Sequence, residues 1–396
     1  MLAIARLLPE AEFAVVRIAQ AYLAVLLIVG VAGVSAPVLR YGADPLISST
    51  EKQQLFGHGL KITLLASITF MLIAFFAVFQ RFPSDSIGRA VHLGYAAQLP
   101  ALAMFSLSVV YLQALQRFQR LALSQLTLKL TAFCLLAGGT FLFGLQGLIL
   151  SALLMTWLSA WFMLRMAPPL FTAKRPKMLP MDFNSLARYS VFGMLLTTLG
   201  QSSDLILLDV LGVNKADVGS YSLASVFFVA AGALVGTAQS VATPAFTALM
   251  NDPVEFRRQL WGWSIGMMGA GVLVAGGLIA GVWLLKLWFF GERYSEFPAL
   301  FAVLMVKFVL WSTYAIGGAA MVGIGAIKQG SWIAVVTTAL AFGAGWPLIR
   351  EYGVWGAALT QVLGAVATFF LVWWVIRDEV RRLERRRVTR TLGDAV

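Results

Sequence analysis

The chain alternates between long apolar stretches and short polar connections. A helix that crosses the hydrocarbon core of a bilayer needs about 17–25 mostly apolar residues. Eleven stretches reach that length, so the pattern predicts an all-α polytopic membrane protein with eleven transmembrane helices. The predicted spans are residues 13–39, 60–80, 90–113, 121–143, 145–167, 188–211, 218–248, 262–290, 297–322, 330–349 and 353–376.

The longest connection divides the chain into two bundles. It covers residues 165–188 and is rich in Pro, Lys and Arg, as is typical of a linker. The other loops are too short to hold a soluble catalytic domain. We therefore predict an N-terminal bundle of five spans at 1–167, a cytoplasmic linker at 168–187, a C-terminal bundle of six spans at 188–376 and a basic cytoplasmic tail at 377–396.

The two bundles repeat each other. Equivalent spans run in the same direction, which indicates a parallel repeat about an axis along the membrane normal. The sixth span has no partner, because a shift of 205 residues places it before the first span. We expect a twelve-helix plan that lacks its first helix, either because the start site is assigned late or because the protein has lost that helix. The matches are QLFGHG (54–59) with QLWGWS (259–264), VRIAQA (16–21) with YSLASV (221–226), and GLQGLILS (144–151) with GVWGAALT (353–360).

Composition and charge add an orientation. Hydrophobic residues make up 60% of the chain and charged residues 12%, whereas soluble domains carry about 25% charged residues. The net charge of +12 does not indicate nucleic-acid binding, because the basic residues lie in loops between apolar spans. Twenty of the 30 Lys and Arg residues lie on the side that includes the tail, so the positive-inside rule places the C-terminus in the cytoplasm. The basic tail is expected to lie as a helix against the anionic inner leaflet.

Few residues are available for enzymatic chemistry. His58 and His92 are the only histidines, too few for a histidine-based metal site or a histidine-dependent catalytic triad. The single cysteine, Cys134, rules out an internal disulfide. We therefore expect no metal, no cofactor and no enzymatic activity.

A polar stripe runs along the sixth span. At 100° per residue, Ser190, Thr197, Gln201 and Asp204 fall within about 60° of one another on a helix. An aspartate at the bilayer centre costs about 2.5–3.5 kcal/mol on insertion scales, so the stripe is expected to face water or protein. Asp204 is either a hydrogen-bonded structural residue or, with Gln201, an ion-coupling site. Asp209 is expected at a solvated helix end near the outer interface.

Three cations lie within or beside spans. Lys307 is near the midplane of its span, Lys129 is about eight residues into its own, and Arg17 is close to the outer end of the first. The alternatives are snorkelling for Arg17 and a structural contact between helices for Lys129. We favour Lys307 as a functional residue. Lys286 and Arg81, which are equivalent at an offset of 205, are expected to anchor helix ends at the interface.

The order and spacing of several motifs resemble the polysaccharide-transporter (O-antigen flippase-like) family. This family belongs to the multidrug/oligosaccharidyl-lipid/polysaccharide exporter superfamily, and the resemblance covers nearly the whole chain. Asp204 is followed by an aliphatic run and then by Gly219, Tyr221 and Ala224. The other matching stretches are TPAFTALMNDPVEFRR (243–258), LWFFGERYSEFPAL (287–300) and PLIREYGVWGAAL (347–359).

The resemblance implies two bundles around a cavity that opens alternately to each side of a bacterial inner membrane. The implied cargo is an oligosaccharide linked through pyrophosphate to a polyprenol, flipped outward for exopolysaccharide or lipopolysaccharide O-antigen synthesis. A pyrophosphate that leaves water needs cationic partners, for which Lys307, Lys129 and Arg17 are the candidates. Asp204 and Gln201 are candidates for coupling to a H⁺ or Na⁺ gradient. Membrane lipids, a polysaccharide polymerase and glycosyltransferases are the implied partners.

Two other functions stay open. A drug or cation antiporter of the same superfamily would need acidic cavity residues without the lysines, so Lys129 and Lys307 argue against it. An integral-membrane polysaccharide polymerase or glycosyltransferase would need a sizeable outer loop with acidic or arginine catalytic residues. The outer loops here are short and hold no carboxylate pair that could act as a base or metal ligand.

Overall fold

The computed structural model describes residues 1–393 except 32, 45, 84, 167–182, 250–251 and 325. This part of the chain is helical and contains no strand, which confirms the all-α prediction. Nine of its helices are long and apolar enough to cross a membrane. Two of the nine contain a sharp turn. The sharp turn in α7 divides this helix into two spans. The part of α13 before its sharp turn continues α12, and the two together form one more span. With these two additions the nine helices correspond to the eleven predicted spans.

The chain forms two compact units, Met1–Ser202 and Ser203–Val396. The boundary between them falls inside α8 (Phe183–Val210). Residues 168–182 of the predicted linker lie outside the described residues, and residues 183–187 form the start of α8. Unit 1 holds residues 183–202 of α8 together with α1 (Leu2–Leu7), α2 (Glu10–Gly30), α3 (Ser35–Ala43), α4 (Ser49–Arg81), α5 (Ser86–Ala96), α6 (Leu99–Ala114) and α7 (Phe118–Met166).

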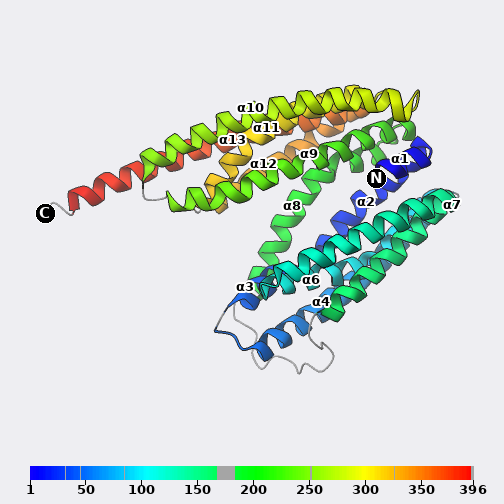
Figure 1. The fold of residues 1–396 in the computed structure, drawn as a ribbon, viewed down its shortest axis with the longest axis horizontal. Helices are drawn as coiled ribbons and strands as arrows, with labels where there is room; N and C mark the ends of the chain where they lie inside the picture. Colours follow the sequence, from blue (N-terminus) through cyan, green and yellow to red (C-terminus); the bar gives the residue numbers. More distant parts are fainter. Residues whose placement is uncertain are drawn as a thin grey trace. The chain divides into compact units, whose positions relative to one another are not determined.

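Unit 2 is built around two central helices, α9 and α11. About half or more of the apolar stretch of each is buried, whereas that of α10 lies mostly at the surface. In Figure 1, α10, α11 and α13 run beside one another. The core contains Phe246, Phe256 and Ile316, all fully or almost fully buried. The helices of unit 2 are α9 (Lys215–Ala248), α10 (Pro253–Leu285), the π-helix η1 (Lys286–Phe290), α11 (Phe297–Gly323), α12 (Ile327–Gly343) and α13 (Gly345–Gly393).

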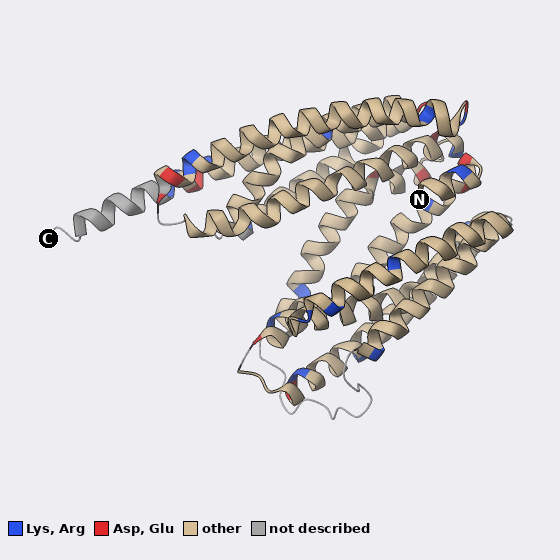
Figure 2. Cartoon of the chain, viewed as in Figure 1, with Lys and Arg blue, Asp and Glu red and all other residues tan. Residues whose placement is uncertain are grey.

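Polar side chains cap the beginnings of the long helices. The Ser48 hydroxyl accepts a hydrogen bond from the Glu51 backbone N–H at the start of α4. Asp252 accepts from the Glu255 N–H at the start of α10, and Asn214 accepts from the Ala216 N–H before α9. These side chains satisfy donors that have no partner within the helix. Figure 2 shows the charged residues gathered mainly toward helix ends, with few in the long middle sections.

The sequence repeat appears as a repeated turn. Gly144 in α7 has φ 57° and ψ −137°, and Gly353 in α13 has φ 57° and ψ −129°. Side chains rarely adopt this conformation, so glycine is required at both turns. After each turn the chain folds back closely: a Cβ on Gly147 would lie 1.9 Å from the Gly139 carbonyl oxygen, and one on Gly356 would lie 2.0 Å from the Leu348 carbonyl oxygen. The same spacing and geometry in both units confirm the pseudo-symmetric plan.

Candidate functional site

The hairpin of α8 and α9 brings Asp204 to Tyr221. The two helices are joined by a short turn that contains Gly212, with φ 68°. Asp204 lies eight residues before that glycine and Tyr221 nine after it, so the antiparallel helices place them at the same level. The Tyr221 hydroxyl donates a hydrogen bond to Oδ2 of Asp204, and the Leu205 N–H donates to Oδ1 at 2.8 Å. Asp204 is only 6% exposed.

Lys307 lies in the same region of unit 2 and is half-buried. It lies about 15 Å along α11 from the start of that helix. Its Nζ donates a hydrogen bond to Oε1 of Gln361 on α13 and lies 4.8 Å from the ring centroid of Phe228 on α9. The Asp204 carboxylate also acts electrostatically on this ammonium group. We call Asp204, Tyr221, Phe228, Lys307 and Gln361 together the Asp204–Lys307 cluster.

The cluster gives each of its two charges compensating partners. Asp204 receives two hydrogen bonds and the opposite charge of Lys307, while Lys307 has an amide oxygen and an aromatic face. A charge buried in a membrane protein is tolerated only with such partners, and cation–π contact with Phe228 adds to them. Loss of either charge would remove the opposite charge that acts on the other. The structure therefore brings together Asp204 and Lys307, two residues that the sequence analysis treated separately.

The other candidates lie elsewhere. Gln201 is exposed on α8, one turn before Asp204. Lys129 is exposed on α7, where no described residue forms a hydrogen bond or ion pair with it. The structural contact between helices considered for Lys129 is therefore absent from the described part of the chain.

Arg17 belongs to a separate polar network inside unit 1. Its guanidinium donates to Oε1 of Gln20 at 2.8 Å, and Nε2 of Gln20 donates to the Tyr95 hydroxyl at 3.2 Å. Close by, the Thr156 hydroxyl donates to Oε1 of Gln98 at 3.0 Å. These glutamines, Tyr95 and Thr156 line a cavity of about 250 Å³. Arg17 is half-buried and hydrogen-bonded within this unit, in contrast to a side chain that only snorkels to the interface.

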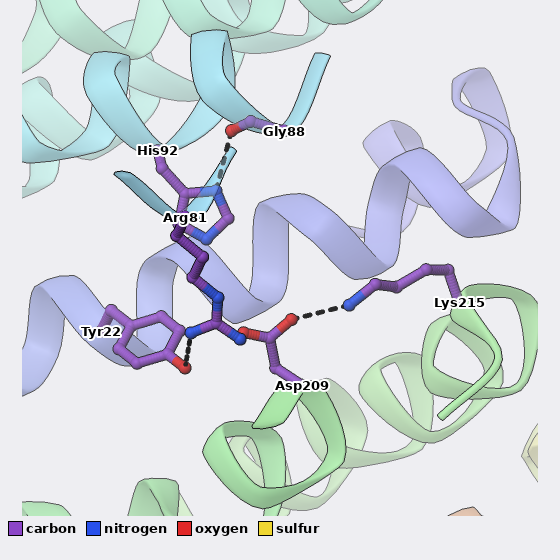
Figure 3. A network of polar contacts seen from close by, with 6 residues as sticks. All are labelled: Tyr22, Arg81, Gly88, His92, Asp209 and Lys215. Atoms are coloured by element: carbon purple, nitrogen blue, oxygen red, sulfur yellow. Dashed lines mark hydrogen bonds and ion pairs between the residues drawn. The ribbon is translucent and has the colours of Figure 1, made fainter. Parts of the chain in front are cut away.

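Asp209 differs from the solvated helix end that the sequence predicts. Its side chain is only 5% exposed and forms an ion pair of 2.7 Å with Lys215, as Figure 3 shows. The short turn between α8 and α9 explains this, because it returns the start of α9 to the end of α8. Within unit 1, the same figure shows Arg81 at the end of α4 donating to the Tyr22 hydroxyl at 2.9 Å. At the matching end of α10, Lys286 donates to the Ser295 carbonyl oxygen at 3.4 Å.

Three members of the cluster were not identified as site residues from the sequence. Tyr221 was noted only as part of a motif, although its distance from Gly212 mirrors that of Asp204 in a hairpin. Gln361 interrupts an apolar span and could have been noted for that reason. Phe228 carries no signal, because it is one of 28 phenylalanines. Among the described residues, no group of three or more His, Cys, Asp or Glu side chains could hold a metal ion.

The comparison with protein families agrees with this architecture. The model of the polysaccharide biosynthesis protein family matches residues 1–250, well over half of the chain. The chain belongs to this family. No curated protein sequence matches it significantly.

Solved structures with the same fold are transporters and flippases. One is a multidrug resistance MATE family transporter of the MOP superfamily in an inward-facing conformation, at 13% identity and a TM-score of 0.78, covering 97% of this chain and 94% of the other. Lipid II flippase MurJ gives 10% identity and a TM-score of 0.73, covering 98% and 88%. A MOP superfamily transporter from Pyrococcus furiosus, whose binding pocket has reversed polarity, gives 16% identity and a TM-score of 0.68. The match covers 96% of this chain and 90% of the other. The chain is thus a multi-pass membrane protein with the fold of this superfamily.

Proposed function

We propose that the protein flips a polyprenyl-pyrophosphate-linked oligosaccharide across the bacterial inner membrane for polysaccharide synthesis. Membership of the polysaccharide biosynthesis family supports the class of cargo, and the likeness to a lipid II flippase shows that this fold can serve a lipid-linked one. The observation that carries the proposal is Lys307, a half-buried ammonium group well inside the spanning helix α11, within the Asp204–Lys307 cluster. A cation at this depth is suited to an anionic headgroup that leaves water.

The cluster suggests how transport is coupled to an ion gradient. With Asp204 ionised, its carboxylate partly neutralises Lys307, and a pyrophosphate must compete with it for the same ammonium. A proton or Na⁺ at Asp204 removes that competition and leaves the full charge of Lys307 for the cargo. Each elementary charge that crosses the membrane contributes about 2.3 kcal/mol per 100 mV. Gln201, one helical turn away and exposed, extends the polar surface from which such an ion would arrive.

Arg17 and Lys129 are further candidates for contact with the headgroup. Arg17 lies beside a polar cavity in unit 1, and Lys129 presents an exposed ammonium on α7. We assign both a weaker role than Lys307. In this scheme the basic C-terminal tail is cytoplasmic, and a polysaccharide polymerase and glycosyltransferases act before and after the flippase.

Glycan export in a flippase-null bacterium tests the proposal. We expect the wild type to restore export, and both Lys307→Ala and Asp204→Asn to reduce it at least tenfold at equal membrane levels. Lys286→Ala is the matched control, because that lysine lies at a helix end and hydrogen-bonds only weakly to a carbonyl oxygen at 3.4 Å. Export by Lys307→Ala at the wild-type level would refute the assigned role of the lysine. Failure of the wild type, with resistance to cationic dyes instead, would favour an antiporter.

A further inference from the structure

A second site lies in unit 2, away from the Asp204–Lys307 cluster. It is a groove of about 670 Å³ formed by α10, α11 and α13. Its walls are mainly apolar and aromatic: Trp261 stacks on Trp373 with ring centroids 5.3 Å apart, and Phe369 lies beside them. Trp261 is 51% exposed, so the groove opens to the outside of the helices. These walls are suited to an acyl chain.

Three arginines line one end of this groove. They are Arg257 near the start of α10, and Arg377 and Arg381 on α13, all exposed. None of them forms an ion pair with a described side chain up to residue 382. Their neighbours behave differently, because Arg258 pairs with Glu255 at 2.8 Å and Arg382 pairs with Asp378 at 2.8 Å. The arginines of the groove therefore leave a local positive charge that no acidic side chain described up to residue 382 neutralises.

Two residues that line the groove also carry buried polar atoms without a hydrogen-bond partner among the described residues. The hydroxyl of Ser264, a residue 2% exposed, lines the groove and has no hydrogen-bond partner among the described residues. The indole Nε1 of Trp373 is likewise buried without an acceptor there. A buried polar group without a partner costs about 1–3 kcal/mol. Two such donors in one groove indicate that acceptor oxygens of a ligand complete them.

The spacing of these groups matches one kind of molecule. Ser264 lies seven residues after Arg257, or about 10 Å deeper along α10, and Trp373 lies four residues before Arg377, or about 6 Å along α13. The groove thus presents cations first, then hydrogen-bond donors at the level of Trp261, then an apolar wall that includes Met268 and Phe369. A glycerophospholipid carries a phosphate, ester carbonyls and acyl chains in the same order. A polyprenyl chain has no acceptor oxygens below its phosphate, so the two donors argue against it.

We propose that this groove binds one anionic glycerophospholipid of the leaflet that faces the basic tail. The arginines hold the phosphate, the Ser264 hydroxyl and the Trp373 indole N–H donate to ester carbonyl oxygens, and an acyl chain lies against Met268 and Phe369. This lipid is distinct from the transported cargo. The inference does not depend on the function proposed above.

Native mass spectrometry of the full chain in detergent tests this site. The probes are phosphatidylglycerol and phosphatidylcholine with identical acyl chains. We expect one phosphatidylglycerol to bind at least tenfold more tightly than phosphatidylcholine. Arg257→Gln with Arg377→Gln should abolish that preference, whereas Arg258→Gln with Arg382→Gln should keep it. The two double variants lose the same number of charges from the same ends of α10 and α13, so equal behaviour of the two would overturn the proposal.

Two further measurements separate this site from general attraction to anionic lipid. Ser264→Leu fills the groove without removing charge and should abolish the tight phosphatidylglycerol, while Ser264→Ala should weaken it severalfold. Thermal unfolding in the absence of lipid confirms that both variants fold. Unchanged binding by folded Ser264→Leu would overturn the proposal. Equally tight binding of polyprenyl phosphate that depends on the same two arginines would overturn it in favour of a cargo lipid.

Discussion

Gly144 in unit 1 and Gly353 in unit 2 form the same turn, but the charged and amide side chains of the two polar sites share no equivalent positions. Unit 2 holds an acid and a lysine, whereas unit 1 holds amides, hydroxyls and Arg17. The repeat places Leu102 where unit 2 has Lys307, and Ala152 where it has Gln361. The two glycines are equivalent because the fold needs the same turn in both units. The polar residues that have no equivalent in the other unit are candidates for function, because the symmetry of the fold does not account for them.

The largest expected effect concerns the two charges of the Asp204–Lys307 cluster. Hydrogen bonds to charged groups contribute about 1.5–3 kcal/mol, so Asp204→Leu, which removes the acceptor of Tyr221, and Lys307→Met, which removes the donor to Gln361, should each lower the free energy of unfolding by about this amount. The double variant should cost less than the sum if the two charges also act on each other. Chemical unfolding of the purified variants in detergent measures this coupling. Strict additivity would show that the two residues do not act on each other.

The shared turn should give equal effects in both units. Gly144→Ala and Gly353→Ala force a side chain into a conformation that costs about 1–3 kcal/mol, and unfolding experiments should show similar losses for the two. Gly138→Ala in unit 1 and Gly364→Ala in unit 2 are the controls, because open space surrounds the added Cβ at both positions. A large loss at only one of the two turns would contradict their structural equivalence.

Loss of the hydroxyl should have different effects at two buried tyrosines, Tyr221 and Tyr95. Tyr221 donates to a carboxylate, and such hydrogen bonds contribute about 1.5–3 kcal/mol. The Tyr95 hydroxyl accepts from a neutral amide at 3.2 Å, for which about 0.5–1.5 kcal/mol is typical. Tyr221→Phe should therefore be the more destabilising of two otherwise identical changes. Equal losses in unfolding free energy would indicate that Asp204 is not charged in the folded protein.

How far the sequence predicts this molecule depends on the distance between the interacting residues. Apolar stretches and glycine motifs are local, and they predict the spans and the repeated turn. Asp204 and Lys307 stand out because charges are rare in spans, but their proximity arises from packing of α8, α9 and α11 and is not visible in either span. Gln361 comes from a fourth helix. Asp209 was wrongly expected to be solvated, because its partner Lys215 lies beyond the intervening turn.

The smallest effect on stability is expected at Lys129, and this makes it the most direct test of function in unit 1. The side chain is exposed and no described residue pairs with it, so Lys129→Met should change the free energy of unfolding by less than about 0.5 kcal/mol. If the ammonium contacts the headgroup, glycan export should still fall severalfold at a normal membrane level. Lys129→Arg keeps the charge and should retain most export. Normal export by Lys129→Met would restrict the anion-binding role to Lys307 and Arg17. Arg17 would then be the only one of the three candidate cations left in unit 1.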